Sequence, residues 1–228
     1  MSEQLQSHET ENFASINNMK INKKKTKIIK FTNARSLDFP PELTFVDGSS
    51  LDTMTETCLL GVVISHDLKW AKNTAYICNK ARRKLWILRR MQFLDLTKQE
   101  LFYVYQKEVR SIMEYAVPVW HSSLTRKQVS EIESVQKIAF KMILGQSYSG
   151  YTDACATLNT ETLEKRRLDI CLRFAKKNVQ SGNSLFTKPN IQHNLRSRNR
   201  LVQEYRCNKV RFERSSLPFL SKLLNQNS

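Results

Sequence analysis

The sequence predicts a mostly α, α+β fold, in which a small antiparallel β-sheet precedes a helical bundle. Only five glycines and five prolines occur in 228 residues, so the chain lacks the turn density of an all-β fold. Long stretches repeat apolar residues every three or four positions, as helices do, while short β-branched runs occur nearer the N-terminus. With 40% hydrophobic residues, a chain of this length can bury a core and should hold one domain or a domain with appendages.

The N-terminal part of the chain divides into an unpatterned segment and a β region. Residues 1–18 are polar and weakly patterned, so we expect a poorly ordered N-terminal segment there. Within residues 19–66, β-branched or apolar runs predict strands at 26–31, 43–46 and 58–64, with a turn at 47–50. These strands should pair as a small antiparallel sheet, which would be marginally stable without further packing.

A helical domain is expected over residues 67–182, and its first helix is amphipathic. One arc of the helical wheel, at roughly 100° per residue, holds apolar or small side chains: Trp70, Thr74, Ile77, Ala81, Leu85 and Leu88. The nearly opposite arc holds the candidate nucleic-acid-binding residues, which are Lys69, Lys72, Tyr76, Lys80, Arg83 and Arg90. No Asp or Glu occurs between Lys69 and Gln92, so ion pairs within the helix cannot neutralise this arc.

Two capping boxes mark the next two helices, at Thr97 and at Thr125, each followed three residues later by Glu or Gln. The first helix should extend to about residue 117, where Pro118 disfavours continuation. Its inner stripe is expected to be Leu101, Tyr105, Ile112 and Ala116. The second helix should end at Gly145, with an apolar face formed by Val129, Ile132, Val135, Ala139 and Met142.

The remaining helices are shorter or less regular in pattern. A short helix is expected over 152–158 and a longer one over 163–180, with Ile170 and Phe174 on one side and Gly182 just beyond its end. Residues 183–228 are expected to form a basic C-terminal tail, in which residues 217–220 suggest a last short helix.

The charge of the chain favours a polyanionic partner. Lys and Arg number 37 against 21 Asp and Glu, which gives a net charge of +16 and a pI near 9.8. Nucleic acid is the first candidate for such a partner, and an anionic membrane surface is the second. No apolar run approaches the roughly 18 residues of a membrane span, and the N-terminus has no signal-peptide pattern. We therefore expect a soluble intracellular protein that does not insert into a membrane.

No catalytic residue, metal site or cofactor is assigned to the chain itself. Its five cysteines stand singly, without metal-ligand spacing, and are expected to be reduced, part-buried thiols. The four histidines, at positions 8, 66, 121 and 193, are equally dispersed, and no pair of carboxylates stands out. Nucleotide-binding glycine motifs and a hydrolase nucleophile elbow are also absent from the sequence.

The basic arc of residues 69–90 is the chemically informative feature. Lysines and arginines along one face can follow a phosphate backbone, each contact adding salt-dependent affinity, and Tyr76 can stack on a base or sugar. The alternative is a solvated face on a basic protein. Trp70 and Trp120 are expected to pack in the core, whereas Trp86 falls between the two arcs and is not assigned to either.

A family resemblance covers residues 19–224, in order and without large gaps. Its pieces are the Lys-rich run at 22–31, the segments 60–64 and 67–70, the helix end at 88–90, and the segments 110–120, 133–137 and 164–167. Together they resemble reverse transcriptases of non-LTR retrotransposons (LINE elements), jockey-like ones especially. The resemblance implies that residues 19–66 are the edge of the palm. It also implies that residues 67–182 are a helical, thumb-like domain that grips the template–primer duplex.

The resemblance further implies what this chain should lack. A complete RNA-directed DNA polymerase of this family holds two Mg²⁺ ions on paired aspartates, but no Asp-Asp pair occurs here. We therefore expect a catalytically incomplete fragment of a transposable element, with Mg²⁺ required only by the complete parent enzyme. Its expected partner is an RNA/DNA hybrid or duplex nucleic acid.

Three alternatives stay open. The helical domain can be a protein-interaction module that presents an exposed apolar face to a protein partner, or the chain can be a retroelement remnant without function. Residues 60–120 also resemble the N-terminal module attributed to AlkB-type nucleic-acid demethylases. The jelly roll and the His-x-Asp iron site of that catalytic fold are not visible in the sequence.

Overall fold

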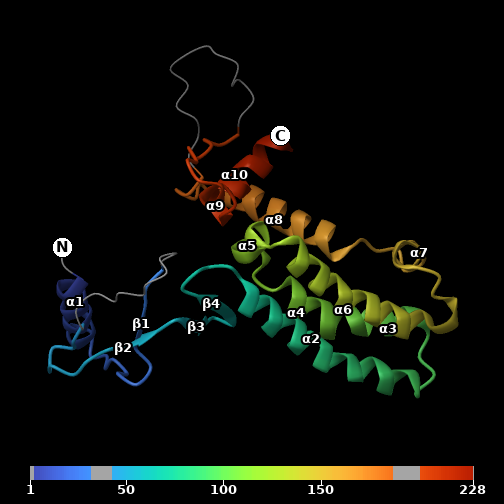
Figure 1. Ribbon diagram of the computed structural model, residues 1–228, viewed down its shortest axis with the longest axis horizontal. Helices are drawn as coiled ribbons and strands as arrows, with labels where there is room; N and C mark the ends of the chain where they lie inside the picture. The colour runs from blue at the N-terminus through green and yellow to red at the C-terminus, as the bar shows by residue number, and fades with distance from the viewer. Residues whose placement is uncertain (1–2, 32–42, 187–200, 228) are drawn as a thin grey trace, which may run out of the picture. The chain divides into compact units, whose positions relative to one another are not determined.

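The computed structural model describes residues 3–31, 43–186 and 201–227. Helices predominate and the strands form two small two-stranded sheets, so the mostly α, α+β fold class is confirmed (Figure 1). The chain divides into two compact units, residues 1–72 and 73–228, a few residues beyond position 67, where the helical pattern begins. His193 and residues 187–200 of the expected basic tail lie outside the described residues.

Unit 1 begins with a helix, α1 (Glu3–Ile16), in the segment where the sequence predicts poor order. This segment contains no glycine or proline and several good helix formers, such as glutamate and glutamine, which favour a helix. Its few apolar residues show no helical period, and Phe13 and Ile16 are exposed. A helix formed by propensity, without an apolar face, is invisible to a reading of hydrophobic pattern.

Unit 1 also holds two two-stranded sheets instead of one three-stranded sheet. β1 (Lys27–Ile29) pairs in parallel with β2 (Asp52–Met54), and β3 (Glu56–Leu59) pairs antiparallel with β4 (Val62–Ser65). The strand predicted at 58–64 is thus a hairpin, because Leu60 and Gly61 form its turn with φ angles of 48° and 80°. Two consecutive positive φ values match the type I′ turn that joins antiparallel strands. No regular strand forms at 43–46, where one was predicted; Thr44 there forms an isolated β-bridge with Ser50.

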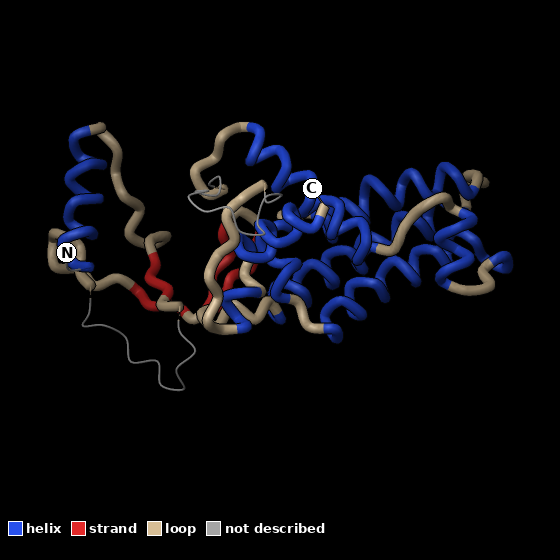
Figure 2. The backbone as a smooth tube through the Cα atoms, turned by 90° about the horizontal axis from the view of Figure 1, so that it is seen from above, coloured by secondary structure: helices blue, strands red, loops and turns tan. Residues whose placement is uncertain are grey.

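Unit 2 is built from helices, several of which lie side by side (Figures 1 and 2). α2 (Ala71–Gln92) leads into this unit from unit 1. In chain order it is followed by α3 (Lys98–Tyr105), a π-helical segment (Gln106–Arg110), α4 (Ser111–Glu114), α5 (Val117–Trp120), α6 (Arg126–Leu144), α7 (Tyr151–Thr157), α8 (Leu163–Gln180), α9 (Val210–Glu213) and α10 (Ser216–Gln226). Contacts of Phe102 and Tyr105 in α3 with Phe140 and Gln136 in α6 show that these two helices run in opposite directions. α8 packs against α5, α6 and α10.

The apolar arc predicted for the first helix is confirmed in α2. All of its members are buried, with at most 7% of any of them exposed: Trp70, Thr74, Ile77, Ala81, Leu85 and Leu88. Trp70 lies just before the helix, with a positive φ of 62°. The buried side of α2 is therefore the side that periodicity identified.

The helix predicted over 97–117 is interrupted and ends earlier, at the end of α4. The π-helical segment between α3 and α4 has a wider turn, which keeps residues four apart on one face. As a result Ile112 and Ala116 are only half-buried, and Pro118 lies in the first turn of α5, where a missing backbone N–H is tolerated. The stripe that is buried consists of Leu101, Tyr105, Val109 and Met113.

The local start and stop signals of the two capped helices are confirmed. Thr97 and Thr125 each form a capping box with the residue three positions later, and Gly145, with a φ of 55°, ends α6. In α6 the predicted face is buried at its centre and half-buried at its ends. The buried members are Ile132, Val135 and Ala139, and the half-buried ones are Val129 and Met142.

α8 has the predicted bounds but a different buried face. Phe174 is 44% exposed and Ile170 is half-buried. The buried face differs from the predicted one. Apolar periodicity missed it because it includes a charged residue, Arg167, which such a pattern assigns to the surface. Its members are Leu163, Arg167, Cys171 and Ala175. Near the C-terminus, α10 is longer than the short helix predicted at 217–220.

Candidate nucleic-acid interface

α2 offers one buried half to unit 2 and leaves the other half in water. The helix contains no glycine or proline along its 22 residues. Arg89 and Arg90 occupy its last turn, where cations interact favourably with the negative end of the helix dipole. Dipole and composition together thus favour an unbroken helix, which presents its exposed side chains in a fixed order.

Polar contacts along its length fix α2 to the neighbouring helices. The guanidinium of Arg82 donates to Ser134 Oγ of α6 at 3.2 Å, and Lys84 Nζ lies 3.0 Å from a carboxylate oxygen of Glu108. At the C-terminal end, the Gln92 side-chain amide donates to the backbone carbonyl of Met142. Because anchors occur in the middle and at the end of the helix, its exposed face is held on a packed scaffold.

Two of the six predicted site residues belong to unit 1 and are paired with carboxylates. Lys69 precedes α2, and its Nζ lies 3.3 Å from Asp67 Oδ2. Lys72 lies in the first turn of α2 and forms an ion pair with Glu56 of β3. Exposed pairs of this kind are weak, but each still offsets part of a positive charge. The two lysines therefore contribute less free cationic charge than the sequence suggests.

The Lys-rich run of residues 22–31 is also partly paired. Lys23 forms an ion pair with Asp47, and Lys27 forms one with Asp52. The hydrogen bond from Lys23 holds the pKa of Asp47 well below its usual value. These lysines consequently bind carboxylates of unit 1, and the run is a weaker candidate for phosphate contacts than α2.

The other four predicted site residues lie on the exposed half of α2. Tyr76 is 40% exposed, and Lys80 Nζ lies 5.9 Å from the centroid of its ring, within the range of a cation–π contact. Arg83 and Arg90 are exposed and seven residues apart, so they share one side of the helix about 10 Å from each other. Among the described residues, neither arginine side chain has an ion-pair or hydrogen-bond partner.

The exposed half of α2 is wider than the predicted arc and includes three residues that the sequence reading left out. These are Arg82, Trp86 and Arg89, all of them exposed. The signal was present in the wheel, since Trp86 lies about 40° from the position of Arg90 and about 100° from that of Leu85. Trp86 was left unassigned from the sequence because it falls between the apolar arc and the arc of the six predicted residues.

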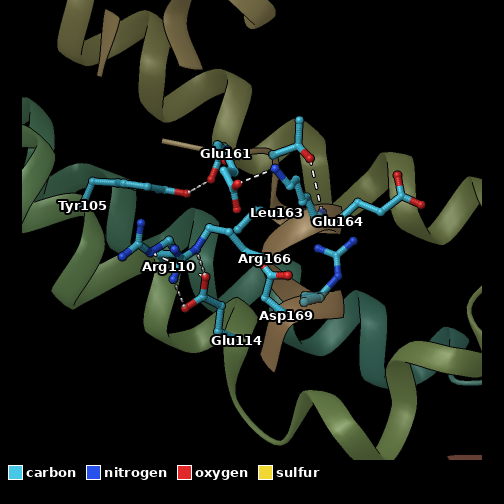
Figure 3. A network of polar contacts seen from close by, with 12 residues as sticks. Tyr105, Arg110, Glu114, Glu161, Leu163, Glu164, Arg166 and Asp169 are labelled. Atoms are coloured by element: carbon cyan, nitrogen blue, oxygen red, sulfur yellow. Dashed lines mark hydrogen bonds and ion pairs between the residues drawn. The ribbon is translucent and has the colours of Figure 1, made fainter. Parts of the chain in front are cut away.

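A cluster of polar side chains lies in the core of unit 2, between α3, α6, α7 and α8 (Figure 3). Tyr105 Oη donates to Gln136 Oε1 at 2.5 Å, and Gln136 Nε2 donates to Tyr151 Oη at 2.8 Å. Tyr151 in turn donates to the carboxylate of Glu133. Burial and that hydrogen bond raise the pKa of the Tyr151 hydroxyl far above its usual value, so it stays a donor. The chain of hydrogen bonds connects three helices through groups that are already satisfied.

Two carboxylates of this cluster hold α8 in place. Glu133 accepts from the backbone N–H of Glu164 at 2.6 Å and of Leu163 at 3.3 Å, so a residue of α6 caps the N-terminus of α8. Arg166 donates to both carboxylate oxygens of Glu114, at 2.5 and 3.2 Å (Figure 3). Because these carboxylates bind donors of the chain itself, we assign them a structural role.

A buried histidine and a buried arginine lie at the edge of the same cluster. Arg167 is fully buried; its Nε donates to His121 Nδ1 at 3.4 Å, and its Nη2 lies 3.9 Å from Glu133 Oε1. Burial, and then the charge of Arg167, lower the pKa of His121 to about 4. His121 is thus neutral near pH 7 and accepts a hydrogen bond in the core.

The described ranges contain neither a cluster of metal ligands nor a helix that could span a membrane. Residues 3–31, 43–186 and 201–227 contain no group of three or more His, Cys, Asp or Glu that could hold a metal ion. The five cysteines are free thiols; Cys78, Cys155 and Cys171 are buried, and burial raises the pKa of Cys171 to about 12. No helix in these ranges is both long enough and apolar enough to span a bilayer.

Comparison of the chain with protein-family models, with curated proteins and with solved structures finds no match. The interface described above therefore stands on its geometry and charge.

Proposed function

We propose that this chain binds nucleic acid through phosphate contacts from the exposed half of α2. The observation that supports the proposal most directly is the segregation of charge on this helix. Its exposed half carries Lys80, Arg82, Arg83, Arg89 and Arg90, and no carboxylate occurs anywhere between residues 69 and 92.

Such an arrangement disfavours the free chain slightly. Like charges three or four residues apart on a helix repel each other by a few tenths of a kcal/mol per pair. A phosphate backbone relieves this repulsion, and each contact also releases a condensed counterion. The cations lie on one side of a helix that is fixed to a packed scaffold. Several phosphates can therefore be contacted at once without the entropic cost of ordering further parts of the chain.

Within this proposal the chain derives from the reverse transcriptase of a non-LTR retrotransposon, and α2 serves as the first helix of a thumb-like domain. Its partner is then an RNA/DNA hybrid or a duplex, held by its backbone and without sequence preference. Nucleotidyl transfer is not part of the proposal, since the chain contains no Asp-Asp pair.

The test is the salt dependence of binding to an RNA/DNA hybrid. A variant with Lys80→Gln, Arg83→Gln and Arg90→Gln removes three cations from α2 and leaves its buried half intact. The matched control, Lys127→Gln with Lys176→Gln and Lys177→Gln, removes three exposed cations from α6 and α8. The two variants have the same net charge, so any difference between them reports on position.

We expect the logarithm of the affinity of the unmodified chain to fall steeply with the logarithm of salt concentration. The α2 variant should lose up to about 0.9 from that slope for each phosphate contact removed. The control should lose affinity only through the general reduction of charge. Equal effects of the two variants, or no binding by the unmodified chain, would overturn the proposal.

A further inference from the structure

Four arginines occupy the positions next to Trp86 on the surface of α2. The neighbours of a helical residue on the surface are those three and four positions away in each direction. For Trp86 these positions are all arginine, namely Arg82, Arg83, Arg89 and Arg90, and each is exposed. Trp86 itself is 60% exposed, so much of its indole stands in water, with arginines at all four neighbouring positions of the helix surface.

The fold makes little use of this indole. Trp70 and Trp120 are 7% and 1% exposed, and Trp120 Nε1 donates to the backbone carbonyl of Tyr115 at 3.0 Å. In the described part of the chain, Trp86 has no hydrogen bond, ring contact or cation–π partner. Leaving a large aromatic surface in water forgoes the stabilisation that burial would provide. The exposed indole is thus available to an occupant from outside.

The charge around the indole restricts which occupant fits. Four arginines, with no carboxylate on α2 itself, favour a polyanion, and the planar guanidinium matches a phosphate in particular. The indole face favours a flat aromatic partner between those phosphates. A nucleic acid places a flat aromatic base beside every phosphate along one chain. In a duplex each base is already stacked on its neighbours, so a side chain on a convex helix meets edges and backbone alone.

We propose that Trp86 stacks on an unpaired base, and that this part of α2 takes single-stranded nucleic acid or the single-stranded segment beside a duplex. This inference rests on the proposed binding of phosphates by α2. Arg82 and Arg90 lie one turn before and after Trp86, about 6 Å away along the axis. The phosphates that flank a stacked base then lie within reach of guanidinium groups on both sides. Stacking of this kind accepts any base, because every base has a π face.

An anionic membrane surface fits the same residues less well. A helix that lies on a membrane buries its apolar face among the lipid chains. The apolar face of α2 is covered by the core of unit 2, and the exposed half carries the arginines and Trp86. Lipid phosphates could meet the arginines, but the helix has no free apolar face to insert.

The experiment measures the binding of three ligands: a short oligodeoxythymidine, a blunt RNA/DNA hybrid and the same hybrid with an unpaired extension. Each ligand is tested with the unmodified full chain, with Trp86→Ala and with Trp86→Phe. Trp86→Ala should weaken binding to the oligodeoxythymidine and to the extended hybrid by roughly 5- to 100-fold, the cost of one lost stacking contact. Its affinity for the blunt hybrid should change by less than about 2-fold, and its salt slope should not change, because no phosphate contact is lost. Trp86→Phe should keep most of the affinity, since a phenyl ring also stacks.

Indole fluorescence gives a second readout that does not depend on folding differences. The oligodeoxythymidine should quench the emission of the unmodified chain, and Trp86→Phe should abolish the quenching, because the other two tryptophans are buried.

Two results would overturn the inference. If Trp86→Ala leaves single-strand binding unchanged while the Lys80, Arg83 and Arg90 variant loses it, α2 binds phosphates and does not stack a base. If quenching that depends on Trp86 appears with phosphatidylserine vesicles and not with the oligodeoxythymidine, the occupant is an anionic lipid surface.

Discussion

Unit 2 contains an Arg-Arg pair in α8 and another in α2, and the two pairs have opposite surroundings. Arg166 and Arg167 of α8 lie in the polar core, where Arg166 binds both carboxylate oxygens of Glu114 and Arg167 is fully buried. Arg82 and Arg83 of α2 are exposed, and only Arg82 has a hydrogen-bond partner among the described residues. Charge in the sequence is therefore no measure of charge available to a ligand.

The placement of carboxylates explains the difference. In unit 2, Glu114 and Glu133 project from helices that face α8, and each accepts hydrogen bonds from it. In the described part of this unit, Lys84 of α2 forms an ion pair with Glu108, whereas no ion pair is formed by Arg82, Arg83, Arg89 or Arg90. The arginines of α8 are thus part of the fold, whereas Arg83, Arg89 and Arg90 of α2 have no ion-pair or hydrogen-bond partner among the described residues, and we propose that they bind an external partner.

The largest effect on stability is expected from Glu133→Gln. This change removes the charge that lies 3.9 Å from the buried Arg167 and weakens the cap of α8. Removing one partner from a buried ion pair typically costs about 3 kcal/mol or more. Urea unfolding should show a loss of about that size in the free energy of unfolding. Glu108→Gln, which breaks the exposed pair with Lys84, should cost less than about 1 kcal/mol. Similar losses in the two variants would contradict the contrast between core and surface.

A somewhat smaller effect is expected from acid, through His121. Its pKa in the folded chain is about 4, below the value of 6.5 of an unperturbed histidine. Between these two values the unfolded chain binds a proton that the folded chain does not, so stability should fall as the pH is lowered from about 6.5 to about 4. The difference of about 2.5 pKa units corresponds to a loss of about 3 kcal/mol at most.

The variant His121→Asn isolates this contribution. An asparagine oxygen can still accept the hydrogen bond from Arg167 but does not titrate in this range. Thermal unfolding between pH 7 and pH 4 should therefore show a flatter pH dependence for the variant than for the unmodified chain. Equal slopes would mean that His121 is protonated in the folded chain or that other groups dominate.

The smallest effect on stability is expected from the surface arginines. Changing Arg83, Arg89 and Arg90 together to glutamine should alter the free energy of unfolding by no more than about 0.5 kcal/mol. Any change should be towards greater stability at low salt, because repulsion between neighbouring cations is removed. Urea unfolding at two salt concentrations would test this. A loss above about 1 kcal/mol would give these residues a role in the fold instead of in binding.

Features that depend on neighbouring residues were predictable from the sequence. The capping boxes at Thr97 and Thr125, the stop at Gly145 and the apolar arc of α2 all follow from local spacing, and the structure has each of them. The hairpin turn at residues 60 and 61 was missed because the apolar run 58–64 was interpreted as one strand in spite of Gly61 at its centre. In the structure, the positive φ angles of Leu60 and Gly61 divide the run into two strands.

Features that depend on distant partners were not predictable. The π-helical segment moves burial from Ile112 to Val109 and Met113, and no short pattern announces it. The burial of Arg167 requires Glu133, which lies more than thirty residues earlier in the chain. At the candidate interface, the helical wheel places Trp86 nearer to Arg90 than to Leu85, and the exposure of its side chain assigns it to the basic side.

The most direct test of the central claim is to locate a bound nucleic acid by nuclear magnetic resonance. The backbone amide signals of α2 and the indole signal of Trp86 would be followed during titration with an RNA/DNA hybrid that carries an unpaired extension. We predict that shifts concentrate at Lys80, Arg83, Trp86 and Arg90, while the indole signal of the buried Trp120 does not move. Shifts that concentrate in α8 or α10 and spare α2 would contradict the account.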